Sequence, residues 1–82
     1  MKILIIDGQG GNIGKALVEQ CRRMYPQSDI IAVGTNSMAT ANMIHSNPSG
    51  SATGENPVVV NARDADFILG PIGIILADSM LG

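Results

Sequence analysis

The sequence predicts an α/β fold, in which a parallel sheet of about four strands is covered by helices on both faces. A continuous apolar run opens the chain at residues 3–6, a glycine-rich segment follows at residues 8–14, and an amphipathic helical pattern starts directly after it. Strands buried on both faces of a parallel sheet have such continuous apolar runs. The order strand, glycine-rich turn, helix is the start of a right-handed βαβ unit. We therefore expect a Rossmann-like three-layer sandwich.

Length and composition indicate one compact domain spanning residues 1–82. Hydrophobic residues make up 45% of the chain and charged residues 15%, which argues against disorder. A chain this short buries only about 60% of the surface that its unfolded form exposes. We therefore expect a homo-oligomer, in which a second subunit supplies the missing burial.

Charge and cysteine content exclude several classes of protein. The net charge is −2 and the five basic residues form no stripe, so nucleic acid is not an expected partner. The single cysteine, Cys21, makes no internal disulfide, and no Cys/His cluster has metal-ligand spacing. The apolar stretch 67–77 is interrupted by glycine and proline and is too short for a membrane span. We expect a cytoplasmic protein that contacts no membrane.

The first half of the chain continues as helix, strand and helix. From Ile13 onward apolar residues recur every three or four positions, until Pro26 stops the helix. Residues 30–33 are a second buried strand, which ends at Gly34. Residues 37–44 are expected to form a short helix, with Thr35, Asn36 or Ser37 as its N-cap.

The second half is expected to contain two more strands and a last helix. Residues 46–56 are rich in Ser, Gly, Asn and Pro and predict a loop. Val58-Val59-Val60 predicts a third strand over residues 57–61, and residues 67–69 predict a fourth. Residues 70–73 predict a turn, and residues 74–81 predict a helix.

The segment Asp7 to Gly14 carries most of the functional information. Between a strand and a helix, glycines permit a tight turn, close approach of the backbone to a phosphate, and close packing of helix on strand. The helix N-terminus adds unpaired N–H groups that attract an anion. We expect the backbone of this turn to hold a phosphate, through the following residues: Gly8, Gln9, Gly10, Gly11, Asn12, Ile13 and Gly14.

The spacing of the glycines narrows the class of site. Gly8, Gly11 and Gly14 give G-x-x-G-x-x-G, the version found in extended short-chain dehydrogenases, whereas G-x-G-x-x-G would need glycine in place of Ile13. A P-loop would need glycine in place of Gln9 and Ser or Thr in place of Ala16. A glycine-rich turn with an empty phosphate site is the remaining alternative.

Two further segments are expected to contact the ligand. The second strand is followed by Thr35 and Asn36, whose side chains could hold a ribose, but the acidic residue typical of NAD sites is missing there. Gly70, Pro71 and Ile72 follow the fourth strand, and ligands in doubly wound sheets lie at the carboxyl ends of strands. We expect these three residues to face the far end of the ligand, although a simple tight turn would explain them equally well.

No catalytic residue is predicted. Short-chain dehydrogenases use a Tyr-x-x-x-Lys pair, and the only tyrosine, Tyr25, is followed at that spacing by Asp29. His45 is a lone histidine, and Cys21 lies on the apolar face of the first helix. The pattern leaves open whether the protein is an enzyme.

Four separated motifs resemble one family of bacterial proteins. They are Ile6 to Gly11, Gly34 to Thr40, Ala52 to Asn56, and Gly70 to Gly73 continuing through Asp78-Ser79-Met80. In this order they resemble the uncharacterised bacterial family catalogued as domain-of-unknown-function family 3842. The resemblance spans essentially the whole chain and implies a Rossmann-like, nucleotide-binding fold without an established activity. It also implies a further helix and strand after Gly82, so that this chain has the length of a truncated member.

The function expected from the sequence is nucleotide binding in a sensing or accessory role. NAD or NADP is the first choice of ligand and an adenine mononucleotide the second. The alternatives are an NAD(P)-dependent enzyme subunit completed by a partner, and a structural or interaction module without a ligand. A Gly11→Val substitution is expected to abolish binding and to leave the fold largely intact.

Overall fold

The structure, a computed structural model, describes residues 1–71 and 73–76 of the chain. The described residues form helices and strands in the following order: β1 (Lys2–Asp7), α1 (Asn12–Met24), β2 (Asp29–Gly34), α2 (Ser37–Ile44), β3 (Gly50–Thr53), α3 (Glu55–Ala62), β4 (Phe67–Gly70) and β5 (Gly73–Leu76).

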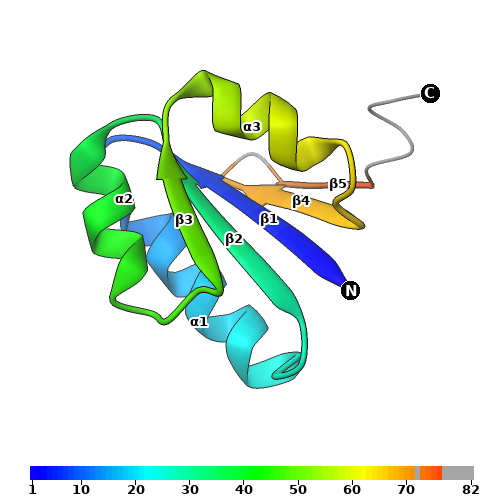
Figure 1. Cartoon of the computed structure of the whole chain (residues 1–82). Helices are drawn as coiled ribbons and strands as arrows, with labels where there is room; N and C mark the ends of the chain where they lie inside the picture. Colours follow the sequence, from blue (N-terminus) through cyan, green and yellow to red (C-terminus); the bar gives the residue numbers. More distant parts are fainter. Residues whose placement is uncertain (72, 77–82) are drawn as a thin grey trace.

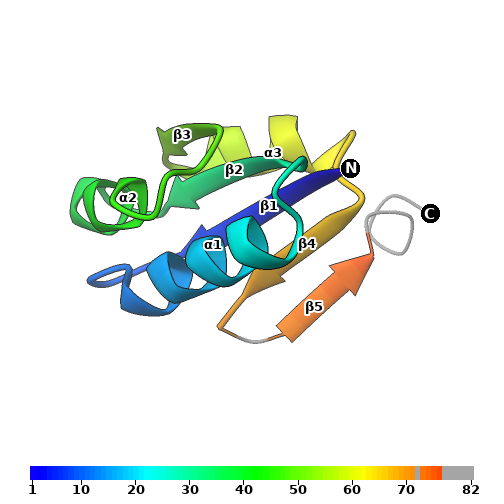
Figure 2. The same cartoon turned by 90° about the horizontal axis from the view of Figure 1, so that it is seen from below.

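The strands form one sheet in the order β3-β2-β1-β4-β5. The first four of these are mutually parallel, and β5 pairs antiparallel with β4. Helices α1 and α2 cover one face of the sheet and α3 covers the other (Figures 1 and 2). The predicted Rossmann-like three-layer sandwich with four parallel strands is therefore confirmed.

Apolar side chains fill both sides of the sheet. Between the sheet and helices α1 and α2 lie Ile3, Ile5, Val18, Cys21, Ile30, Ala32 and Met43. Between the sheet and α3 lie Leu4, Val33, Ala62, Ala65 and Ile68. Consecutive residues of β1 thus enter opposite layers, which explains why its sequence is apolar without alternation. Burial also raises the pKa of the Cys21 thiol.

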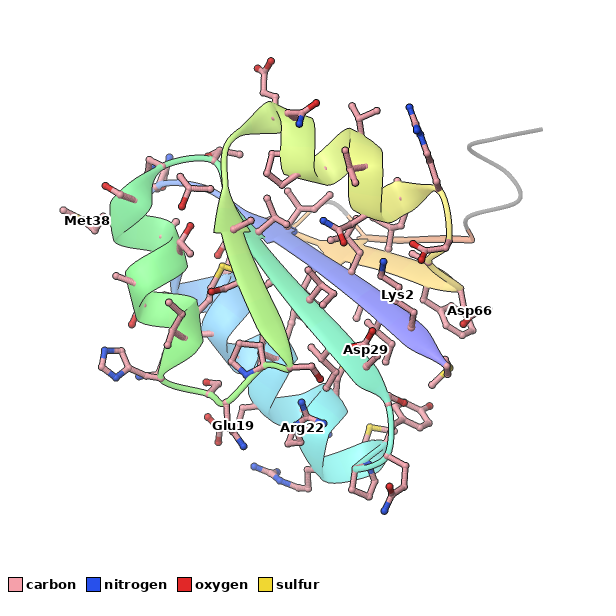
Figure 3. All side chains as sticks on the ribbon, in the orientation of Figure 1. Lys2, Glu19, Arg22, Asp29, Met38 and Asp66 are labelled. Atoms are coloured by element: carbon pink, nitrogen blue, oxygen red, sulfur yellow. The ribbon has the colours of Figure 1, made fainter. Side chains whose placement is uncertain are left out.

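The first half of the chain folds as the sequence predicts. Helix α1 ends at Met24, shortly before Pro26, and Arg22 and Arg23 lie in its last turn, where they complement the helix dipole. Helix α2 has the predicted bounds, and Asn36 is its N-cap. Met38, labelled in Figure 3, points away from this helix into solvent and is 71% exposed.

The predicted third strand at residues 57–61 is wrong, because this segment belongs to helix α3. Val58 and Ala62, one helical turn apart, face the core, whereas Val59 and Val60 are half-exposed. A crossover between parallel strands needs about a dozen residues or more. A strand at residues 57–61 would leave only residues 62–66 before β4, so the topology overrides the β propensity of the three valines.

The true third strand lies inside the segment predicted as a loop. Residues 50–53, with the sequence Gly-Ser-Ala-Thr, pair in parallel with residues 31–34 of β2. This strand is at the edge of the sheet, and its alternate residues are exposed. Edge strands are short and polar in many proteins, which is why no apolar pattern marked this one.

The predicted helix at residues 74–81 is wrong over residues 74–76, which belong to strand β5. Residues 77–81 lie outside the described part of the chain. The predicted turn before it is confirmed, because Gly70 and Gly73 face each other across a tight antiparallel connection. A short apolar run fits a helix and a strand equally well, so periodicity could not decide between them.

Polar contacts tie α3 and β4 to the start of β1. The backbone amide of Lys2 donates to the Asp66 carboxylate over 2.8 Å, and its ammonium contacts Asn61 and Asp64. Figure 3 shows Lys2 and Asp66 where the first and fourth strands begin. The hydrogen bond from Lys2 lowers the pKa of Asp64. This cluster lies at the amino ends of the strands, away from the glycine-rich turn.

Replacing Val59 and Val60 together by alanine tests the helical state of residues 55–62. Alanine has a higher helix propensity than valine. The free energy of unfolding of the double variant, measured by urea denaturation, should therefore be about 0.5 kcal/mol higher than that of the parent protein. In a strand the same change would lower the free energy of unfolding. A clear loss of stability would therefore contradict the helix.

Candidate functional site

The candidate site lies where the parallel strands end at their carboxyl sides. At this edge the chain continues from β1 into α1. Strand β2 lies on one side of β1 and β4 on the other, so the strand order reverses between β1 and β4. Open α/β sheets bind ligands at this switch point. A cavity of about 260 Å³ opens here, lined by Ile6, Asp7, Gly8, Thr35, Ile68, Leu69, Gly70, Pro71 and Gly73.

The structure brings several predicted site residues to this cavity. Gly8, Thr35, Gly70 and Pro71 all line it, although they come from three different parts of the sequence. Ile72 lies outside the described residues. The other residues of the glycine-rich turn are not in the lining, and Asn12, Ile13 and Gly14 form the start of α1.

The glycine-rich turn folds back onto itself before the helix starts. The amide of Gly11 donates to the carbonyl of Gly8 over 3.0 Å, and the amide of Lys15 donates to the carbonyl of Gly11 over 2.9 Å. Gly11 has a φ of 76°, in the left-handed region that glycine adopts readily. The chain therefore enters α1 at Asn12 through a tight turn.

The Asp7 carboxylate joins the two ends of this turn. One oxygen accepts from the amide of Gly8 over 2.8 Å, and the other accepts from the amide of Gly14 over 2.6 Å. The side chain is 6% exposed. Asp7 thus caps α1 from the end of β1, a role that sequence reasoning missed. The signal was present as a single acidic residue between an apolar strand and the first glycine.

Asp7 leaves two amides of the first helical turn free. Within the described part of the chain, the amides of Asn12 and Ile13 have no protein acceptor, whereas that of Gly14 is bonded to Asp7. Both Asn12 and Ile13 are exposed. Their amides carry the partial positive charge of the helix N-terminus.

The three regularly spaced glycines each lie close to other atoms of the chain. A Cβ atom at Gly8 would lie 2.8 Å from Thr35 Oγ1, and one at Gly14 would lie 2.7 Å from Asp7 Cβ. At Gly11 it would lie 2.5 Å from the carbonyl oxygen of Ala39 in α2. The expectation that Gly11→Val leaves the fold intact is therefore wrong, because the valine would collide with backbone.

Gly10 differs from these three glycines. The nearest atom to a Cβ placed there is Asn12 Nδ2, at 3.8 Å, and its φ is not in the left-handed region. A side chain at residue 10 therefore fits without displacing its neighbours. This residue is the suitable one for testing the turn by substitution.

Asn42 of α2 holds the turn from the opposite side. Its Nδ2 donates to the carbonyl of Gly10 over 2.9 Å and to Asn12 Oδ1 over 2.7 Å. No pattern in the sequence indicates this contact, since residue 42 is one of several polar residues in a short helix. Asn42 makes the position of the turn depend on α2.

Of the two predicted ribose-binding side chains, Asn36 already has a structural role. Its Oδ1 accepts from the amide of Ala39 over 2.8 Å and caps α2. Two other residues of the motif also have a structural role: a Cβ at Gly34 would collide with Thr40 Oγ1, which is 2.7 Å from Thr53 Oγ1. Thr35 is exposed at the cavity and remains available.

The described residues offer neither a metal cluster nor a membrane helix. No three His, Cys, Asp or Glu side chains come together there in an arrangement suited to a metal ion. The helices within residues 1–71 and 73–76 also lack the length and hydropathy of a membrane span.

The fold and the switch-point cavity define a Rossmann-like α/β protein. The chain belongs to the family described as domain of unknown function DUF3842, whose model matches residues 2–82. No curated protein and no solved structure matches it.

Removing the α2 cap should destabilise the protein by a defined amount. Asn36→Ala should lower the free energy of unfolding by about 1 kcal/mol, because the amide of Ala39 loses its acceptor. Asn36→Asp should retain most of the stability, since aspartate caps equally well. Thermal denaturation of both variants measures the difference. Equal stability of the alanine variant and the parent would contradict this role.

The glycines should respond differently to alanine. Gly11→Ala should lower the free energy of unfolding by about 2 kcal/mol or more, because the left-handed backbone and the contact with Ala39 both oppose a Cβ. Gly10→Ala should change it by less than about 0.5 kcal/mol. Urea denaturation compares them, and a larger loss in the Gly10 variant would show that the turn is packed differently.

Proposed function

We propose that this protein binds a nucleotide at the switch-point cavity, in a sensing or accessory role. The observations that carry the proposal are the cavity at the carboxyl ends of β1 and β4 and the two unpaired amides at the start of α1, the helix that follows β1. A phosphate needs N–H donors and positive potential, and a helix N-terminus supplies both. The amides of Asn12 and Ile13 are the proposed phosphate donors.

The size of the cavity supports binding of one ring rather than of a whole dinucleotide. Pockets for complete small-molecule ligands measure roughly 300–1,000 Å³. The cavity of about 260 Å³ lies just below this range and is walled by apolar residues such as Ile68 and Leu69. A ring packed against this apolar lining, with its phosphate outside at α1, is the proposed arrangement.

The end of β2 favours an adenine mononucleotide over NAD or NADP. Dinucleotide sites of this fold use an acidic residue there to bind the adenosine ribose. Here Gly34 is followed by Thr35 and Asn36, and the Asn36 carboxamide oxygen is bonded to Ala39. One hydroxyl, that of Thr35, is left for a sugar. A mononucleotide needs no second ribose site.

A sensing or accessory role fits the chemistry of the cavity lining. Among the described residues that line it, Asp7 and Thr35 are the polar side chains, and neither has a histidine, lysine or cysteine partner in the lining. Activation of a hydroxyl nucleophile needs an adjacent general base, and the two oxygens of Asp7 already accept from the amides of Gly8 and Gly14. An enzyme completed by a partner subunit would take its catalytic residues from that subunit.

A thermal-shift screen with AMP, ADP, ATP, NAD, NADH, NADP, NADPH, GTP and FMN tests the proposal. A ligand present at one hundred times its dissociation constant adds about 2.7 kcal/mol of stability. For a domain of this size that corresponds to a rise of about 10–20 °C in the unfolding midpoint. We expect the largest rise with an adenine mononucleotide. No rise with any of these compounds, on folded protein, would favour a ligand-free interaction module.

Gly10→Asp locates the phosphate. The new carboxylate would lie beside the amides of Asn12 and Ile13, and it should weaken binding of AMP about tenfold or more through repulsion of the phosphate. Gly10→Ala is the matched control, since it adds a side chain without charge and should bind as the parent does. Calorimetric titration measures both. Equal affinity of the two variants would place the phosphate elsewhere.

A further inference from the structure

Asn42 of α2 determines how the side chain of Asn12 is oriented. Its Nδ2 donates to the carbonyl of Gly10 over 2.9 Å and to Asn12 Oδ1 over 2.7 Å. A backbone carbonyl only accepts hydrogen bonds, so the Asn42 atom that faces Gly10 has to be the amide nitrogen. The other N–H of this nitrogen needs an acceptor as well, so the Asn12 atom that it meets has to be Oδ1. The contact with Gly10 thus fixes both carboxamides.

This orientation leaves the NH₂ group of Asn12 free. Among the described residues its Nδ2 donates to no other group, and Asn12 is exposed. Nδ2 lies on the Gly10 side of the turn, 3.8 Å from the place that a Cβ at Gly10 would take. The chain therefore presents a side-chain donor to solvent whose direction is set from α2.

Asn12 also supplies one of the two free backbone amides at the start of α1. The amides of Asn12 and Ile13 have no protein acceptor in residues 1–71 and 73–76, and the first turn of α1 contains no acidic residue. A few covalent bonds separate Nδ2 of Asn12 from the backbone nitrogen of the same residue. The start of α1 therefore offers three donor nitrogens to one anion: the two backbone nitrogens and Asn12 Nδ2.

This set of donors matches a terminal phosphate. A phosphate monoester carries three strong acceptor oxygens. In the pyrophosphate of a dinucleotide each phosphorus has a further bridging bond and so one such oxygen fewer. Hydrogen bonds from N–H groups to an ionised acceptor are stronger than those to a neutral one. The donor set therefore favours a phosphate monoester over a dinucleotide.

We infer that the Asn12 side chain binds the phosphate together with the backbone amides of Asn12 and Ile13, and that Asn42 is the positioning residue that directs its NH₂ group outward. This inference rests on the proposed function and deepens it, because it names the side chain that distinguishes a nucleoside monophosphate from the nucleoside. Asn42 acts through Asn12 and touches no ligand itself.

Asn12→Ala tests the inference, with AMP and adenosine as probes in calorimetric titration. The variant loses the NH₂ donor, and its affinity for AMP should fall about tenfold, because hydrogen bonds to charged groups are the stronger kind. The affinity for adenosine should stay as in the parent protein, since the nucleoside has no phosphate. Damage to the turn or the cavity would weaken both ligands. Equal losses for AMP and adenosine, or no loss for AMP, would overturn the inference.

The role of Asn42 is tested by a double-mutant cycle with AMP. Asn42→Ala alone should weaken AMP binding, because the Asn12 carboxamide is then free to rotate. In the Asn12→Ala background the same change should have no further effect, since its partner is absent. Fully additive losses would show that Asn42 acts on the turn without Asn12 and would contradict the positioning role.

Asn12→Asp avoids dependence on the stability of the alanine variants. Its carboxylate still accepts from Asn42, and an acidic side chain in the first turn of a helix is stabilising. The free energy of unfolding should therefore be equal to that of the parent or higher, whereas the affinity for AMP should fall about tenfold or more through loss of the donor and repulsion of the phosphate. AMP binding as tight as in the parent would overturn the inference.

The outcomes separate this inference from the proposed function. If AMP binds the parent, Asn12→Ala and Asn12→Asp equally well, the inference fails and nucleotide binding stands. If the parent protein binds neither AMP nor any other nucleotide of the thermal-shift screen, the proposed function fails, and the inference fails with it.

Discussion

The bond between the Asp7 carboxylate and the amide of Gly14 is the contact on which the candidate site depends. It joins the last residue of β1 to the first turn of α1 within a buried layer. Two further contacts extend this arrangement to α2: Gly11 lies against the backbone of Ala39, and Asn42 holds Gly10. The position of the glycine-rich turn is thus set from the sheet and from both helices of one layer.

The glycine pattern alone does not distinguish a ligand site from a packing requirement. A Cβ would not fit at Gly11 or Gly14, and one at Gly8 would displace the Thr35 hydroxyl, so packing within the chain favours glycine at all three positions of the G-x-x-G-x-x-G spacing. The support for a ligand comes from different features. These are the cavity at the switch point and the two amides of α1 that Asp7 leaves unpaired.

Sequence reasoning succeeded where the local pattern and the topology agree. At residues 2–24 an apolar run, a glycine-rich segment and a proline after the helix all indicate the strand, turn and helix that the structure has. Gly8, Thr35 and Gly70 line one cavity, as the rule that ligands lie at the carboxyl ends of strands predicts. Sequence reasoning failed at residues 55–62, because the length needed for a crossover between parallel strands overrides the β propensity of three valines. It also failed at the edge strand before them, whose residues are too polar to show an apolar pattern. Asp7 and Asn42 were missed because their partners are backbone groups brought close by folding.

A crystal structure of the protein with AMP tests the central claim most directly. If the cavity is a nucleotide site, the phosphate oxygens should lie about 2.7–3.2 Å from the amides of Asn12 and Ile13, with the nucleoside in the cavity at the carboxyl ends of β1 and β4. A phosphate bound at any other surface, or a cavity that stays free of AMP under saturating conditions, would contradict it.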